Sequence, residues 1–201
     1  MITLLAATAL LAGAQETALK HCFTRLNRPV ARALLLSRTL DQAAVYAKKV
    51  RLKTNCTATG KYSGFYSFQP TGGSVESMRG VVAEVLVKDD MRLAAALQVL
   101  PIQREYSRPW FAATGRHVSI DEMATCIADT NPRGVLYLLG SGAKAAGEAA
   151  AFAALEPSSK ACLRAEFKLV GNRQIIRGAL ADALYQRMVA AAPIQSRTEQ
   201  R

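Results

Sequence analysis

The sequence predicts an all-α protein made of two tandem helical modules of about four helices each. Three observations carry this prediction: apolar residues recur at helical spacing, two blocks of sequence occur twice in the same order, and each copy contains two cysteines. Half of the 201 residues are hydrophobic, which is ample for a core. This composition excludes a collagen, a coiled-coil rod and a wholly disordered chain.

The repeat sets the predicted domain boundaries. With a shift of 104 residues, Cys22 aligns with Cys126 and Leu34-Leu35 aligns with Leu138-Leu139. With a shift of 98, residues 78–86 align with residues 176–184, which is the stronger match. We therefore expect a signal peptide at 1–14, module 1 at 15–100, a linker at 101–116, module 2 at 117–192 and a polar C-terminal tail at 193–201.

Capping residues and prolines set the expected helix limits. Ser119 is predicted to cap the first helix of module 2, and Asn131-Pro132 to end that helix and begin the next. We expect the Ala-rich helix that starts at 143 to stop before Pro157, and the closing helix from 173 to end at 191, before Pro193. In module 1 the expected helices cover 17–26, 29–37, 40–52 and 75–87, with a short hairpin between the second cysteine and the last helix.

The first fourteen residues have the character of a signal peptide. The apolar run MITLLAATALLAGA ends in Ala12-Gly13-Ala14, a small-x-small pattern that predicts cleavage near Ala14. The run is shorter than the roughly 20 residues that span a bilayer, so we expect a periplasmic or secreted protein whose mature chain has no transmembrane segment. A positive charge before the apolar run is missing. Two alternatives follow: the true start of translation lies slightly upstream of Met1, or the segment is an ordinary buried helix.

Export gives the four cysteines a structural role, because thiols pair in an oxidising compartment. Three connectivities are possible. The spacings from Cys22 to Cys56 and from Cys126 to Cys162 are nearly equal, 34 and 36 residues, and neither has the close spacing of a zinc ribbon or a redox motif. We therefore predict the bridges Cys22–Cys56 and Cys126–Cys162, one in each module.

Two features qualify as candidate binding sites. Arg79-Gly80 and Arg177-Gly178 recur inside predicted helices, where glycine indicates close helix packing. The arginine then either pairs locally or caps backbone carbonyls, or the two arginines form equivalent anion-binding sites. The second feature is an insertion that is peculiar to module 1 and rich in aromatic residues. Its side chains would either stack on a ligand or cover the helices as a hairpin. The candidate residues in it are Lys61, Tyr62, Phe65 and Tyr66.

Positive charge is concentrated in module 1. The chain carries a formal charge of +11, and residues 20–53 hold nine Lys or Arg against Asp41 alone. For an exported protein this favours an anionic envelope polymer, lipid or protein as partner and makes nucleic acid an improbable one, although a solvated helix face is the simpler alternative. The candidate contacts are Arg28, Arg32, Lys48 and Lys49.

No catalytic, metal or cofactor motif is recognisable in the chain. His21 adjoins Cys22, but neighbours on a helix point in different directions and the repeat places Thr125 at the position equivalent to His21. His117 is expected in solvent. The segment 140–144, Gly-Ser-Gly-Ala-Lys, lacks the spacing of a phosphate-binding loop and is predicted to be a turn between helices.

The paired cysteines, the helix start at Asn131-Pro132 and the run Arg177 to Tyr185 resemble uncharacterised exported proteobacterial proteins made of two-cysteine helical modules. The resemblance implies export and disulfides and brings no activity with it. The expected function is that of a non-enzymatic binding or scaffold protein of the cell envelope. A hydrolase-like periplasmic enzyme with its site between the modules is the alternative.

Overall fold

A computed structural model describes residues 26–50, 75–141, 145–163 and 173–198. Within these ranges the chain is helical and contains no strand, which confirms the predicted all-α class. The predicted helix at 17–26 and the predicted hairpin of module 1 lie outside the described residues, apart from the end of the former. The elements are α2 Arg28–Leu35, α3 Leu40–Ala47, α4 Val75–Asp89, α5 Met91–Ala95, the 3-10 turn η2 Phe111–Ala113, α6 Val118–Thr130, α7 Pro132–Gly140, α8 Ala145–Cys162 and α9 Arg173–Thr198.

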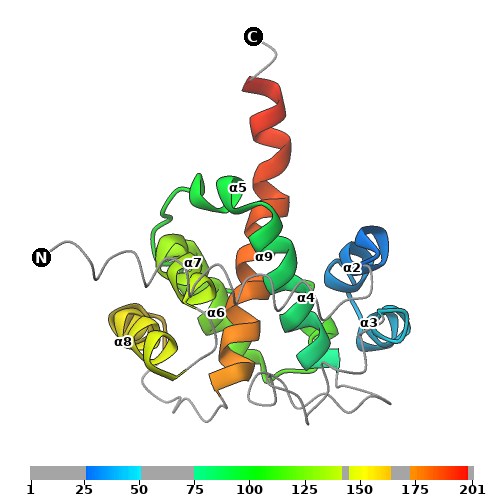
Figure 1. Cartoon of the computed structure of the whole chain (residues 1–201), viewed down its shortest axis with the longest axis horizontal. Helices are drawn as coiled ribbons and strands as arrows, with labels where there is room; N and C mark the ends of the chain where they lie inside the picture. The colour runs from blue at the N-terminus through cyan, green and yellow to red at the C-terminus, as the bar shows by residue number, and fades with distance from the viewer. Residues whose placement is uncertain (1–25, 51–74, 142–144, 164–172, 199–201) are drawn as a thin grey trace, which may run out of the picture.

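The helices are arranged around α9. Figure 1 shows α9 running through the middle of the molecule, with α2 and α3 on one side and α7 and α8 on the other. Helices α4 and α6 both pack along α9. The apolar residues that these helices bury include Val82, Met123, Ile127, Leu180 and Leu184, and they belong to a single hydrophobic core. Burial of this continuous core supplies the main drive to fold.

Local capping explains several helix starts. Asn131 ends α6 and its side chain accepts a hydrogen bond from Gly134 N at 2.9 Å, with Pro132 in the first turn of α7 as predicted. The start of α6 differs from the prediction, because His117 rather than Ser119 caps this helix. His117 Nδ1 accepts from Ser119 N at 3.4 Å and lies 2.7 Å from the Ser119 hydroxyl, so the predicted cap residue instead belongs to the first turn.

Two prolines do not end helices as predicted. Helix α8 continues through Pro157 to Cys162, and α9 continues through Pro193 to Thr198. A proline inside a helix leaves the carbonyl four residues earlier without its donor. Those carbonyls belong to Ala153 and Val189, which are exposed residues, so water can take the place of the missing donor. The predicted helix limits were wrong because exposure decides what such a break costs.

The segment that joins α5 to α6 packs against the helices. Its buried side chains include those of Tyr106, Trp110, Thr114 and Arg116, and the aromatic rings of Trp110 and Phe111 meet edge to face at 4.6 Å.

Among the described residues, no helix is both long enough and apolar enough to cross a membrane.

Candidate functional site

The centre of the molecule is a close crossing of α4 and α9 at two glycines. A Cβ atom built on Gly80 would lie 2.6 Å from Gly178 Cα, and one built on Gly178 would lie 3.0 Å from Gly80 Cα. Backbone atoms occupy both positions, so neither helix can accept a methyl group without moving. The glycines therefore allow a helix approach that any other residue would prevent.

The arginine that precedes each glycine caps another helix. Arg177 donates from Nη1 to Leu138 O at 2.9 Å and from Nη2 to Leu139 O at 3.0 Å, which are carbonyls in the last turn of α7. Arg79 does the same for α2, donating to Leu34 O at 2.6 Å and Leu35 O at 3.0 Å. The last carbonyls of a helix lack intrahelical donors and carry its negative dipole end, so a cation is the natural partner for them.

Each arginine also forms an ion pair with a carboxylate on the opposite helix of the crossing. Arg177 Nη2 lies 2.7 Å from Glu84 Oε1, and Arg79 Nε lies 2.9 Å from Asp182 Oδ2. All four side chains are at most 1% exposed. Both arginines thus cap carbonyls, one of the roles considered from the sequence, whereas their carboxylate partners are not local, since they lie 103 and 93 residues away in the chain.

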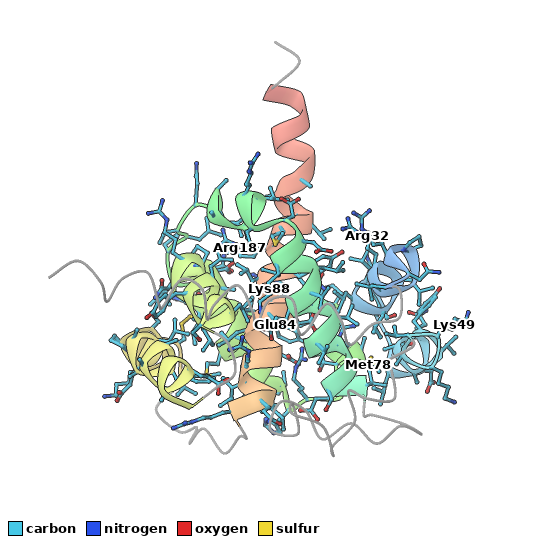
Figure 2. All side chains as sticks on the ribbon, in the orientation of Figure 1. Arg32, Lys49, Met78, Glu84, Lys88 and Arg187 are labelled. Atoms are coloured by element: carbon cyan, nitrogen blue, oxygen red, sulfur yellow. A yellow bond between two sulfur atoms is a disulfide. The ribbon has the colours of Figure 1, made fainter. Side chains whose placement is uncertain are left out.

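Sequence reasoning missed the carboxylate partners, although a signal was present. Glu84 follows Arg79 by five residues and Asp182 follows Arg177 by five, so the 98-residue shift aligns acid with acid as well as arginine with arginine. Two aligned acids at a fixed distance from two aligned arginines indicate reciprocal pairing. The side chains of Glu84 and the neighbouring Lys88 are labelled at the centre of the view in Figure 2.

A third arginine enters the network beside Asp182 only. Arg116 donates from Nη2 to Asp182 at 2.8 Å and from Nε to Asp121 at 2.7 Å, and Thr114 donates its hydroxyl to Asp121 at 2.6 Å. Nη1 of Arg116 is buried, and no described residue accepts a hydrogen bond from it. Gly115, with φ of 72°, provides the left-handed turn that brings Arg116 into the core. Sequence analysis had assigned Arg116 to the linker.

The pKa values of the carboxylates in these networks are shifted in opposite directions. Burial by itself raises the pKa of Glu84 and of Asp182, but two adjacent cations outweigh it in each case, and both pKa values are lowered. Burial dominates at Asp121, where Arg116 offsets it only in part and the pKa is raised. Burial also raises the pKa of Glu76, which feels the charge of Arg116 as well.

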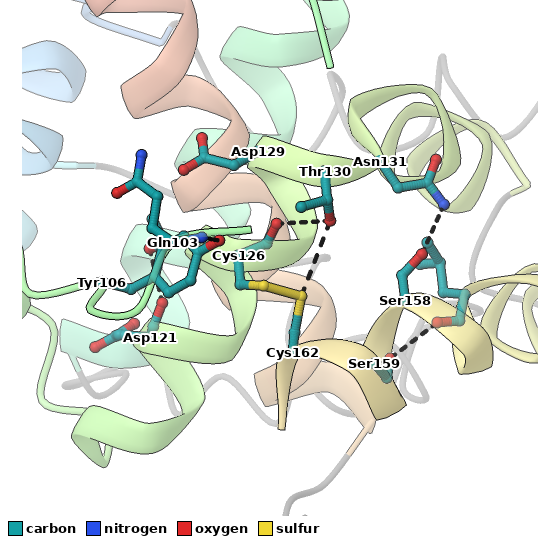
Figure 3. The surroundings of a disulfide bond; sticks show 12 residues. Gln103, Tyr106, Asp121, Cys126, Asp129, Thr130, Asn131, Ser158, Ser159 and Cys162 are labelled. Carbon is teal, nitrogen blue, oxygen red and sulfur yellow. Dashed lines mark hydrogen bonds between the residues drawn. A yellow bond between two sulfur atoms is a disulfide. The ribbon is translucent and has the colours of Figure 1, made fainter. Parts of the chain in front are cut away.

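The predicted bridge of module 2 is present. Cys126 of α6 and Cys162 at the end of α8 form a disulfide with a Cα–Cα distance of 5.7 Å, shown in Figure 3. Thr130 donates its hydroxyl to Cys126 O within α6. Asn131, at the junction of α6 and α7, donates to the Ser158 hydroxyl of α8 at 3.0 Å, so a polar contact joins this junction to α8 beside the bridge. The second predicted bridge, Cys22–Cys56, lies outside the described residues.

A small cavity of about 120 Å³ lies beside this disulfide. Its lining includes Arg104, Tyr106, Glu122 and both bridged cysteines. Tyr106 accepts a hydrogen bond from Gln103 N at 2.8 Å, which fixes its ring at the wall. The volume corresponds to a few water molecules, too small for a typical ligand pocket.

The predicted anionic-surface contacts lie on α2 and α3, and their surroundings differ. Arg28 forms an ion pair with Asp89 at 2.9 Å, so its charge is already matched. Arg32 lies beside the Tyr185 ring hydroxyl, where it opposes the rise that burial causes in the pKa of Tyr185. Lys48 and Lys49 are exposed at the end of α3, with Lys49 Nζ 5.4 Å from the Tyr46 ring centre. Figure 2 shows Lys49 at the outer edge of the molecule.

The remaining predicted candidates stay untested. Lys61, Tyr62, Phe65 and Tyr66 lie outside the described residues. His117 is exposed, as expected, and serves as a helix cap. Within the part of the chain that the structure describes, no three side chains of the metal-binding types cluster as a metal site would require.

The chain matches no protein-family model, no curated protein and no solved structure.

Proposed function

We propose that this chain is an exported, disulfide-stapled helical protein of two tandem modules that acts as a non-enzymatic binding or scaffold protein of the cell envelope. The proposed contact is an anionic surface, recognised through the basic residues of α2 and α3. Each module would carry one bridge, and the protein would work in the periplasm or outside the cell.

The matched contacts at the helix crossing support the tandem-module proposal. Residues aligned by the repeat have equivalent roles: Arg79 and Arg177 each cap a helix of their own half, and each pairs with an acid of the other half. Gly80 and Gly178 meet each other at the crossing. A duplicated chain whose halves pair around a pseudo-two-fold axis would produce this reciprocity.

The observation that carries the binding proposal is a difference between the halves. The α2–α3 segment 28–49 exposes Arg28, Arg32, Arg38, Lys48 and Lys49 and contains one acid, Asp41. The stretch that the 104-residue shift aligns with it, 132–153, contains two basic residues, Arg133 and Lys144, and one acid, Glu148. Because the scaffold does not require these charges in both halves, the basic residues of α2 and α3 are better explained by a partner.

The hydrolase alternative receives less support from the packing. A catalytic cleft between the halves would have to open where α4 and α9 cross, and backbone contact fills that position. The buried acids there are neutralised by adjacent arginines rather than directed at a solvent-accessible space.

Retention on an immobilised polyanion tests the binding proposal. We expect the charge-reversed variant Arg32→Glu, Lys48→Glu, Lys49→Glu to elute at much lower salt than the unmodified protein, because these side chains would form the contact. The control variant Arg92→Glu, Arg104→Glu, Arg133→Glu changes net charge equally at exposed sites elsewhere. Equal elution of the two variants would mean that net charge alone governs retention and would reject a specific basic face.

Intact mass and non-reducing peptide mapping of protein from fractionated cells test export and stapling. We expect loss of about 14 residues, as the signal-peptide pattern indicates, together with Cys22–Cys56 and Cys126–Cys162 peptides. An intact N-terminus with free thiols would place the protein in a reducing compartment and make nucleic acid the leading partner.

A further inference from the structure

We propose that the partner of the α2–α3 face is an anionic lipid bilayer, on which this face lies with apolar side chains inserted between the headgroups. The proposal rests on the proposed function and specifies its partner. We define the α2–α3 face as Arg32, Leu36, Arg38, Val45, Lys48 and Lys49.

Apolar and basic side chains alternate on the outer side of this helix pair. On α2 the buried residues are Ala31, Leu34 and Leu35, so Arg32 and Leu36, four residues apart, share the outward side. On α3 the buried residues are Ala43 and Ala47, which leaves Val45 and the two lysines outward. Leu36 is 48% exposed and Val45 is 52% exposed, and each has cations within a helical turn.

The charges of the face are available to a partner. Arg38, Lys48 and Lys49 form no ion pair with a carboxylate of the described residues, whereas Arg28 pairs with Asp89. Asp41 is the single acid of α3. It lies in the first turn, where its negative charge interacts favourably with the positive end of the helix dipole. The residual positive charge thus complements an anionic surface.

The exposed leucine and valine favour lipid over a purely ionic polymer. A nucleic acid or polyphosphate binds cations through its phosphates and offers no apolar environment in which exposed aliphatic side chains could be buried. An interfacial helix uses both, since its apolar side chains enter the headgroup region while lysine and arginine contact anionic headgroups. The α7 helix offers an internal contrast, because its exposed Arg133 and Tyr137 have no second cation on that helix.

Co-sedimentation with lipid vesicles tests the proposal. The exported form, without residues 1–14, is titrated with phosphatidylcholine vesicles with and without phosphatidylglycerol, at low and at high salt. One variant removes charge (Arg38→Gln, Lys48→Gln, Lys49→Gln), a second removes apolar surface (Leu36→Ser, Val45→Ser), and a control changes α7 (Arg133→Gln, Tyr137→Ser). All variants lack the apolar run at residues 1–14, so a difference between them reports on the α2–α3 face.

We expect binding only to vesicles that contain phosphatidylglycerol, with about a hundredfold weaker binding in the charge variant, since each cation at an anionic membrane contributes roughly fivefold. The apolar variant should bind about tenfold or more weakly, and the α7 control should bind like the unmodified protein. Circular dichroism verifies that all variants are folded.

Two results would overturn the proposal. If the apolar variant binds vesicles as well as the unmodified protein does, the contact is purely ionic and the lipid assignment is wrong. If the protein is retained on the polyanion but binds no vesicle, the partner is a soluble polyanion and the proposed function stands without the bilayer. If the protein is neither retained on the polyanion nor bound to vesicles, the proposed function is rejected as well.

Discussion

The guanidinium of Arg177 on α9 and the carboxylate of Glu84 on α4 face each other at 2.7 Å with both side chains buried. Glu84 also accepts from Lys88 at 2.9 Å, and Arg177 extends to the α7 carbonyls. This pair therefore joins three helices, since it links α4 and α9 directly and α7 through the arginine. Arg79 and Asp182 link α4, α9 and α2 in the same manner.

Removing one member of the Arg177–Glu84 pair should destabilise the protein strongly. The variant Arg177→Met leaves the Glu84 charge buried and two α7 carbonyls without their donor, and we expect a loss of about 3–5 kcal/mol in the free energy of unfolding. The double variant Arg177→Met, Glu84→Leu should lose less than the two single variants together, because it removes both charges. Urea unfolding of the four proteins gives the coupling energy. An additive double variant would contradict the pairing.

The same network predicts how stability depends on pH. The pKa of Glu84 is lowered in the folded protein, so the unfolded chain takes up the proton first as the pH falls. The stabilisation is complete above the ordinary carboxyl pKa and is lost as the pH falls through the lowered folded value. We expect Glu84→Gln to be less stable at neutral pH and to lose less stability on acidification, measured by urea unfolding from pH 7 to pH 3.

Asp121 should show the opposite dependence and provides the matched control. Because its folded pKa is raised, the folded protein binds the proton first, and acidification through the interval above the ordinary value stabilises the fold. The variant Asp121→Asn removes that gain, so its stability should fall more steeply than that of the unmodified protein over this interval. If both variants showed the same slope, the assigned directions would be wrong.

Structural features set by neighbouring residues could be predicted from the sequence, whereas features set by tertiary packing could not. The boundary at Asn131-Pro132 was predictable because an Asx cap and a first-turn proline act within a few residues. Pro157 was misread because its cost depends on which side of α8 faces solvent. The partner of Arg116, Asp182, lies 66 residues away, and only packing reveals it.

The repeat made the arginines of the candidate site conspicuous, yet their role depended on burial. A pair of aligned arginines is compatible with an external anion or with internal carboxylates, and periodicity cannot measure which side is covered. The α4 helix shows why: residues 78–87 are all buried, so no amphipathic stripe marks an exposed face. The charges on α2 and α3, by contrast, alternate with buried alanine and leucine and were predicted as a surface.

Removing the disulfide should destabilise the half that contains α6 and α8. The bridge closes a loop of 36 residues, for which the chain-entropy argument gives about 4 kcal/mol. We expect the Cys126→Ala, Cys162→Ala variant to lose about 2–4 kcal/mol in unfolding free energy. Because this variant lacks the Cys126–Cys162 bridge, dithiothreitol cannot lower its stability further through that bridge. Urea unfolding with and without reductant measures both. Unchanged stability would show that the bridge leaves the unfolded state unconstrained.

The glycine crossing makes the sharpest packing prediction. In Gly80→Ala the new methyl would meet Gly178 Cα at 2.6 Å, so α4 and α9 must separate and the Arg79 and Arg177 ion pairs across the crossing must lengthen. We expect a loss of about 1–3 kcal/mol despite the better helix propensity of alanine. Gly140→Ala is the control, because a Cβ there meets no described atom within 4 Å. This variant should leave stability unchanged or raise it by up to about 1 kcal/mol. Thermal and urea unfolding of the two variants decides the matter, and equal stability of both would mean that α4 and α9 do not touch at this point.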